Sequence, residues 1–172
     1  MSIRGYFCYN FPMKNIRGIT QKIIEKLTLD QQTITFAESC TGGRIAAEFT
    51  AVSGASSILL GSVVTYSNAI KHQWLGVRIT TLENEGAVSE ACVREMLNGV
   101  QKLADSNYAI AVSGIAGPTG GTEFKPVGTV YIGIKTPFSE KIFHCYFNGD
   151  REEIQEQSVI FAIEKLEKAI KF

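Results

Sequence analysis

Two nucleophilic side chains stand next to each other in the segment TFAESCTGGRIAAEF, residues 35–49. Ser39 and Cys40 follow a short apolar run and directly precede Thr41, Gly42 and Gly43. A serine hydroxyl needs an adjacent base that takes its proton, whereas a cysteine needs only a lowered pKa. The segment is therefore a candidate for nucleophilic catalysis. An inert tight turn with a buried cysteine as core filler is the competing interpretation.

The segment TYSNAIK, residues 65–71, offers candidates for the base. It carries Lys71, and His72 follows directly. A lysine becomes a base when burial or a nearby cation lowers its pKa, and serine–lysine pairs are an established alternative to the Ser-His-Asp triad. A lysine that stays in solvent has no such role. Residue types alone leave both the nucleophile and the base open.

A third segment, SGIAGPTGG at residues 113–121, is dense in glycine and also follows an apolar run. In an open α/β sheet, ligand sites gather where strands end and helices begin, because loops converge there and helix starts expose free amides. Each segment alone is compatible with a simple turn. Their combination favours one site built from all three.

The hydrophobic pattern predicts the elements that must position these segments. Apolar residues at helical spacing predict helices over 15–28, 44–50, 67–75 and 89–104, the last with a buried face of Val93, Met96, Leu97, Val100 and Leu103. Runs rich in β-branched residues predict strands over 33–37, 58–66 and 108–114. Thr80 and Glu83 have the spacing of a helix capping box.

The C-terminal third is predicted to contain two alternating strands, over 127–136 and 141–149, joined by a short turn into an antiparallel hairpin. Asp150 is placed to cap a final helix, with acidic residues in its first turn and lysines near its end. Strands that alternate with helices predict an α/β fold. We expect a three-layer α/β/α sandwich on a mixed, mostly parallel sheet, with the hairpin and the terminal helix at the C-terminus.

Composition limits the function classes. With 172 residues and 45% hydrophobic content, the chain fits one domain over 15–172, preceded by an extension over 1–14. Basic and acidic residues number 17 each, so we expect no nucleic-acid partner. The four cysteines and two histidines lack metal-ligand spacing, which predicts no metal site. Single, widely spaced cysteines and no apolar segment long enough for a membrane span predict a cytoplasmic protein without a membrane partner.

Seven segments, in this order and spacing, closely resemble the CinA carboxy-terminal family of bacterial nicotinamide mononucleotide amidohydrolases. They are AESCTGG (37–43), VTYSNAIK (64–71), LGV (75–77), GAVSE (86–90), SGIAGPTGG (113–121), KPVGTVYIG (125–133) and FNGDR (147–151). The resemblance covers about residues 15–170. It implies an α/β/α sandwich on a mixed sheet, in agreement with the fold expected from periodicity, and a homo-oligomer, dimer or tetramer.

The resemblance further implies a reaction and its residues. The reaction is hydrolysis of nicotinamide mononucleotide to nicotinic acid mononucleotide and ammonia, in pyridine nucleotide salvage, without metal or organic cofactor. By motif position Ser39 is the nucleophile, Lys71 the general base, Tyr66 an assisting group and Arg151 a substrate-binding residue. On chemical grounds we expect the amides of Thr41, Gly42 and Gly43 to stabilise the oxyanion.

The remaining substrate contacts are expected from the glycine-rich loop. Its residues Ser113, Gly114, Ala116 and Gly117 are candidates to line the ribose phosphate, with Arg44 or Lys125 as counter-charges. Two other hypotheses use the same segments. One is a non-catalytic nucleotide-binding module linked to competence or the DNA-damage response, and the other is an enzyme with Cys40 as nucleophile.

Overall fold

Five strands form one mixed sheet in the computed structural model, which describes residues 16–170; the predicted extension over 1–14 lies outside these residues. The strands are β1 (Ile34–Glu38), β2 (Leu59–Val64), β3 (Tyr108–Gly114), β4 (Thr129–Lys135) and β5 (Glu140–Tyr146). The helices are α1 (Ile16–Leu29), α2 (Arg44–Thr50), α3 (Asn68–Leu75), α4 (Ile79–Asn84), α5 (Glu90–Ala104) and α6 (Arg151–Ala169), with a 3₁₀ turn η1 (Ala55–Ser57).

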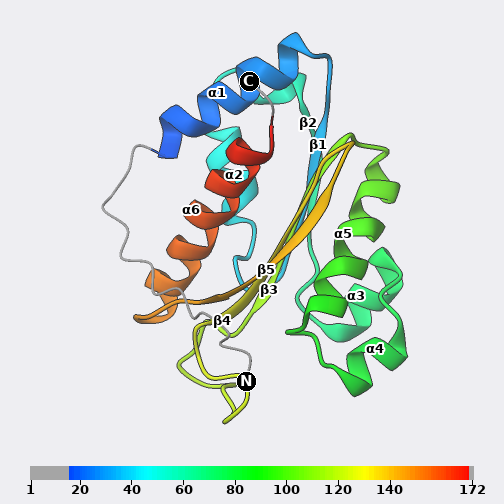
Figure 1. The fold of residues 1–172 in the computed structure, drawn as a ribbon, viewed down its shortest axis with the longest axis vertical. Coiled ribbons are helices and arrows are strands. Elements are labelled where there is room, and N and C mark those ends of the chain that lie inside the picture. The colour runs from blue at the N-terminus through cyan, green and yellow to red at the C-terminus, as the bar shows by residue number, and fades with distance from the viewer. Residues whose placement is uncertain (1–15, 171–172) are drawn as a thin grey trace.

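The sheet has the order β2-β1-β3-β4-β5. Strand β1 pairs in parallel with both β2 and β3, whereas the β3–β4 and β4–β5 pairs are antiparallel. Helices α1, α2 and α6 cover one face of the sheet, and α3, α4 and α5 cover the other (Figure 1). The predicted α/β fold, with three layers, a mixed sheet and a C-terminal hairpin, is confirmed.

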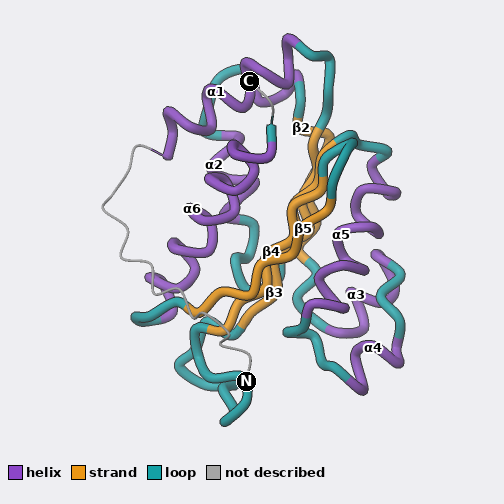
Figure 2. The backbone as a smooth tube through the Cα atoms, in the orientation of Figure 1, coloured by secondary structure: helices purple, strands orange, loops and turns teal. Residues whose placement is uncertain are grey.

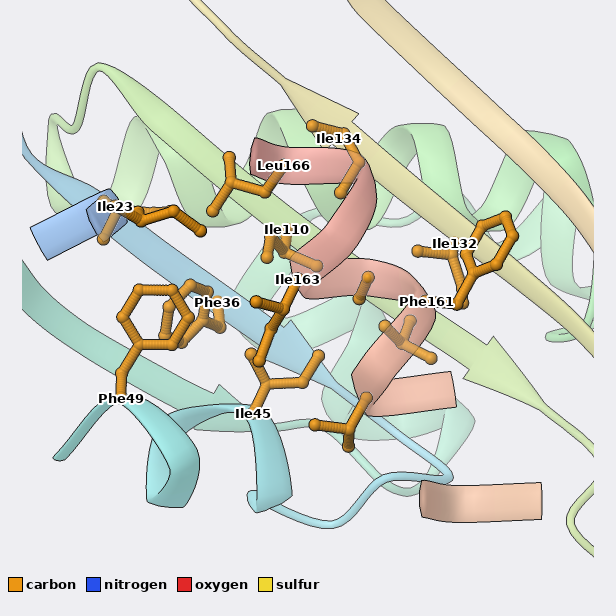
Figure 3. Close-up of a cluster of buried hydrophobic side chains, with 14 of the residues drawn as sticks. Ile23, Phe36, Ile45, Phe49, Ile110, Ile132, Ile134, Phe161, Ile163 and Leu166 are labelled. Atoms are coloured by element: carbon orange, nitrogen blue, oxygen red, sulfur yellow. The ribbon is translucent and has the colours of Figure 1, made fainter. Parts of the chain in front are cut away.

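Each face of the sheet packs on its own apolar core. Strand residues such as Phe36, Ile110 and Ile132 meet side chains of α1, α2 and α6, including Phe49 and Leu166, on one face (Figure 3). On the other face α5 packs against the sheet with a second buried cluster, which includes Val93, Met96, Leu97 and Val100. Burial of both faces explains why β1 and β3 read as continuous apolar runs.

The parallel pairing decides where a site can form. Because β1, β2 and β3 run in the same direction, their carboxyl ends meet at one edge of the sheet, and the strand order switches direction beside β1. Two backbone hydrogen bonds extend the pairing past the strand ends: Ser39 N donates to Val112 O (3.0 Å), and Thr65 N donates to Glu38 O (2.9 Å). The long β3–β4 loop leaves the sheet at this end (Figure 2).

Side chains from the loops cap three helices. Ser67 caps α3, Ser89 caps α5, and Asp150 caps α6 in a reciprocal capping box with Glu153, so the predicted cap at Asp150 is confirmed. The capping box predicted for Thr80 is wrong.

Helix α4 begins at Ile79, and its N-cap residue Arg78 makes no side-chain cap. The start of α4 is instead held by α5: Glu95 accepts hydrogen bonds from Arg78 N (2.8 Å) and Thr81 Oγ1 (2.8 Å).

The buried face predicted for α5 is wrong at Leu103, since 60% of its surface is exposed. Leu103 belongs to the last turn of α5, which ends one residue later at Ala104.

Candidate active site

A tight turn carries the candidate nucleophile. Ser39 follows β1 directly, and Gly42 N donates to Ser39 O (3.1 Å), which closes a β-turn over residues 39–42. Gly43 then starts α2 with a left-handed backbone (φ 97°), a conformation that a residue with a Cβ rarely adopts. Ser39 is 7% exposed, so its hydroxyl lies in a nearly closed environment.

A buried carboxylate holds this turn in place. Glu38 is fully buried at the end of β1. One of its oxygens accepts hydrogen bonds from Thr41 Oγ1 (2.7 Å), Gly43 N (3.0 Å) and Ile45 N (3.1 Å), and the other accepts from Ala46 N (3.0 Å). A negative charge at a helix N-terminus is also stabilised by the helix dipole. Glu38 therefore joins the first turn of α2 to the strand that precedes the nucleophile.

These contacts correct the expected oxyanion donors. The amide of Gly43 is bound to Glu38, and the amide of Gly42 closes the turn on Ser39 O, so neither is available to a ligand. The backbone N–H group of Thr41, in contrast, has no hydrogen-bond acceptor among the described residues. Of the predicted donors, only Thr41 has an amide without an acceptor among the described residues.

Lys71 lies next to the nucleophile. It belongs to the first turn of α3, and its Nζ is 3.0 Å from Ser39 Oγ. Nζ also donates to the carbonyl oxygens of Thr65 (2.7 Å) and Tyr66 (3.3 Å), both in the segment that links β2 to α3. The side chain is 1% exposed. It is therefore not the solvated surface lysine of the competing interpretation.

The surroundings of Lys71 favour the neutral amine. Burial lowers the pKa of Lys71 below its ordinary value of 10.5, and the nearby thiols of Cys92 and Cys40 oppose this only in part. Within residues 16–170 no carboxylate forms an ion pair with it. A neutral amine has two N–H donors and one lone pair. The two carbonyls can take both donors, which leaves the lone pair for the hydroxyl proton of Ser39.

Cys40 has the opposite environment. It is 5% exposed and belongs to the apolar core between the sheet and α1, α2 and α6. Burial raises the pKa of its thiol to about 12, so the thiol is protonated near neutral pH. The protonated thiol is a poor nucleophile. His72, the other base considered, has its Nδ1 2.8 Å from Val77 O and does not line the cavity described below.

Tyr66 and Arg151 meet at the mouth of the site. Arg151, the first residue of α6, donates from Nη2 to Tyr66 Oη (3.0 Å) and from Nη1 to Gly117 O (2.7 Å). These bonds join the β2–α3 segment, the glycine-rich loop and α6, which are far apart in the sequence. Tyr66 is 62% exposed. The contact therefore lies at the solvent side of the buried Ser39 and Lys71 pair.

Two adjoining cavities open at this edge of the sheet. The smaller, about 200 Å³, is lined by Ser39, Cys40, Tyr66, Lys71, Ala87, Val88, Ser113, Gly114, Ala116 and Arg151. The larger, about 590 Å³, is lined by Ala116, Pro118, Val127, Gly149, Asp150, Arg151 and Glu152. Because Ala116 and Arg151 line both, the two cavities lie next to each other between the nucleophile and the start of α6.

Most of the predicted residues meet in the smaller cavity, but several do not line it. Thr41, Gly42, Gly43 and Gly117 are not among its lining residues, although the carbonyl of Gly117 holds Arg151. Neither cavity is lined by the two expected counter-charges, Arg44 and Lys125, and Lys125 Nζ donates instead to Glu85 O (2.6 Å).

Sequence reasoning missed part of the site. It missed the wall formed by Ala87 and Val88, where Ser113 Oγ donates to Ala87 O (2.8 Å). It also missed Glu38, although a carboxylate that ends an apolar strand just before Gly-Gly was a visible signal.

The described residues hold no group of three or more His, Cys, Asp or Glu side chains arranged to bind a metal ion. No described helix is long and apolar enough to cross a membrane.

Comparison with known proteins gives consistent matches. Residues 16–170 match the family described as CinA C-terminal domain. The chain is similar to a CinA-like protein of Fervidobacterium nodosum (47% identity over 148 residues, 86% of this chain and 36% of the relative). It is also similar to one of Thermotoga maritima (46% over 153 residues, 88% and 37%). The chain thus spans about a third of the length of these curated relatives.

Solved structures agree with this assignment. A competence-damaged protein (CinA) superfamily protein from Escherichia coli superposes with a TM-score of 0.89 at 31% identity, covering 94% of each chain. A protein of the same superfamily from Klebsiella pneumoniae gives a TM-score of 0.86 at 38% identity, covering 90% of this chain and 97% of the other.

Proposed function

The chain belongs to the CinA C-terminal domain family, and from this membership and the site geometry we propose that it hydrolyses the carboxamide of nicotinamide mononucleotide. The products are nicotinic acid mononucleotide and ammonia. The observation that carries the proposal is the buried Lys71 amine, 3.0 Å from Ser39 Oγ and without a carboxylate partner among the described residues. A desolvated amine beside a serine hydroxyl is the arrangement of a serine–lysine hydrolase.

The first half of the reaction forms an acyl-enzyme. Neutral Lys71 takes the proton of Ser39 Oγ as the oxygen attacks the amide carbon, and the carbonyl electrons move onto the amide oxygen. Lys71 then gives its proton to the departing nitrogen, and the C–N bond breaks to release ammonia. The carbonyls of Thr65 and Tyr66 accept from Lys71 in both protonation states, so the lysine need not move during the transfer.

The second half removes the acyl group. Lys71, neutral again, takes a proton from a water molecule that attacks the ester carbon. The Ser39 oxygen leaves with that proton, and the carboxylic acid product is released. In both halves the negative charge on the substrate oxygen needs donors, and the unpaired N–H group of Thr41, two residues after Ser39, is suited to that role. The reaction uses no group outside the chain other than water.

The two cavities suit the two halves of a nucleotide. The smaller, about 200 Å³, has room for a pyridine ring with its carboxamide but not for a whole nucleotide, which has to extend into the larger one. Arg151 lines both cavities and can pair with a phosphate. The carboxylates of Asp150 and Glu152, in the larger cavity, are suited to ribose hydroxyls.

A second candidate function is a nucleotide-binding module without turnover. A relative from Thermoanaerobacter, 41% identical over 162 residues, is described as a putative competence-damage inducible protein. The same cavities would then hold a nucleotide for regulation. Burial of Lys71 argues against this function, because a lysine that binds phosphate is more effective charged and facing the ligand.

Incubation of the purified protein with nicotinamide mononucleotide separates the two functions. We expect ammonia and nicotinic acid mononucleotide in equal amounts, and we expect the Lys71→Met variant to bind the nucleotide but convert it at least about 100-fold more slowly. Calorimetry measures the binding. Nucleotide binding by the wild type with no ammonia above a protein-free blank, at neutral and alkaline pH, would support the binding module and exclude the amidase.

A further inference from the structure

Gln155 reaches from the second turn of α6 to the nucleophile turn. Its Nε2 donates a 2.7 Å hydrogen bond to Cys40 O, across 115 residues of sequence. This oxygen belongs to the Cys40–Thr41 peptide, which is the central peptide of the turn that Gly42 N closes on Ser39 O. Gln155 therefore contacts the one peptide of the turn that makes no hydrogen bond within the turn.

The central peptide of a β-turn has two main orientations, related by a flip that distinguishes type I from type II turns. The flipped orientation needs a positive φ at the third residue, which here is Thr41. Both Cys40 and Thr41 have negative φ, and positive φ is especially unfavourable for a β-branched residue. Gln155 and the identity of Thr41 thus hold the peptide in the same orientation.

The other side of this peptide carries an unpaired donor. Thr41 is fully buried, and its N–H has no acceptor among the described residues. A buried N–H without a partner is costly and uncommon in folded proteins. In a trans peptide the N–H and C=O point in opposite directions, so the N–H points away from Gln155. The side chain of Thr41 is fixed independently by Glu38.

We propose that Gln155 is a positioning residue for amide hydrolysis. Its bond to Cys40 O keeps the Cys40–Thr41 peptide in the orientation that leaves Thr41 N–H free for the oxyanion formed when Ser39 attacks. This inference rests on the proposed amidase function. Arg151 and Gln155 are four residues apart on α6, so one face of that helix contacts both the mouth of the site and the nucleophile turn.

Two substitutions of nearly the same size test the proposal. Gln155→Met removes the donor, and Gln155→Glu replaces it with an acceptor that repels Cys40 O. The matched control is Gln157→Met: Gln157 lies on the same helix and is also half-buried, but it donates to Asn148 O (2.7 Å) and Glu153 O (3.0 Å). Neither acceptor belongs to the turn.

With nicotinamide mononucleotide as substrate, we expect Gln155→Met to lower kcat about tenfold while KM stays within about twofold, because the lost alignment acts on the transition state. Gln155→Glu should lower kcat further, and Gln157→Met should match the wild type. A Gln155→Met enzyme with wild-type kcat would overturn the proposal. So would a rise in KM with kcat unchanged, because it would indicate a role in substrate binding.

A second assay does not depend on the substrate. A fluorophosphonate forms a bond from Ser39 Oγ to phosphorus as the phosphorus–fluorine bond breaks, with the serine proton passing to Lys71, and mass spectrometry measures its rate. We expect slower labelling in Gln155→Met than in Gln157→Met. A wild type that is labelled but releases no ammonia would refute the proposed function, while the labelling rates would still test Gln155. Equal labelling rates in the two variants would refute the role of Gln155.

Discussion

Replacing Lys71 by methionine tests whether burial makes this lysine a base. The substitution keeps a long unbranched side chain in a site that is 1% exposed, and it removes the only titrating group of that side chain. The informative quantity is the difference in free energy of unfolding between wild type and variant as a function of pH. The bonds from the amine to the carbonyls of Thr65 and Tyr66 are made in both protonation states, so their loss shifts the difference without changing its slope.

The expected slope follows from counting protons. Below the lowered pKa of Lys71, folded and unfolded wild type both hold its proton, and the difference is constant. Between the lowered pKa and 10.5, the unfolded chain holds the proton and the folded protein does not. The wild type therefore gains stability relative to the variant as pH rises, by up to about 1.4 kcal/mol per pH unit. Above 10.5 the difference is constant again.

Urea unfolding of both proteins, from about pH 6 to about pH 10, measures this difference. Lys102→Met, on the exposed surface of α5, removes the same charge from the unfolded chain, and subtracting its effect leaves that of the buried site. A difference that stays flat over the whole range would mean that the pKa of Lys71 is not lowered, and the argument for a neutral base would fail.

Turnover by Lys71→Met should also fall by about 10²- to 10⁴-fold, the usual contribution of general acid–base catalysis.

Three further predictions concern the site and its support. The kcat/KM for nicotinamide mononucleotide should rise with pH up to the lowered pKa of Lys71 and then level off, and a profile that falls over this range would contradict the neutral base. Glu38→Gln should lower the free energy of unfolding by at least about 2 kcal/mol, since the carboxylate accepts four hydrogen bonds; an unchanged urea midpoint would refute its role. Gly99→Ala should lower the free energy of unfolding by about 1–3 kcal/mol and reduce turnover, because its Cβ would lie 2.0 Å from Leu75 O on the helix that carries Lys71. The control is Gly61→Ala, whose Cβ would have no atom within 4 Å. Equal urea midpoints for the two variants would contradict this prediction.

Hydrophobic periodicity was sufficient to predict most elements. The bounds predicted for α2 and β3 agree with the structure. Those of α1 and β1 are shifted by one residue at both ends, and those of α3 and α5 differ by one residue at the start. These segments have strong local patterns because both faces of the sheet are buried. The strand-to-helix order also predicted that the three loops would meet, since parallel strands end at the same edge of a sheet.

Contacts between distant segments were not readable from the sequence. Ser39 and Lys71 are 32 residues apart, and hydrophobic periodicity does not predict that the amine lies 3.0 Å from the hydroxyl. The family resemblance supplied that pairing. The amide of Gly43 seemed available because its capping partner, Glu38, reads locally as part of a strand. Gln155 gave no signal at all, because its partner is a backbone carbonyl 115 residues away.

The central claim is that Ser39, and not its neighbour Cys40, attacks the amide. The most direct measurement is ammonia release from nicotinamide mononucleotide by Ser39→Ala and Cys40→Ala, each purified and shown to be folded. We expect Ser39→Ala to release no more ammonia than the blank. Cys40→Ala should keep most of the wild-type rate, since its thiol is protonated and packed in the core. Loss of turnover in Cys40→Ala together with turnover retained in Ser39→Ala would contradict the account.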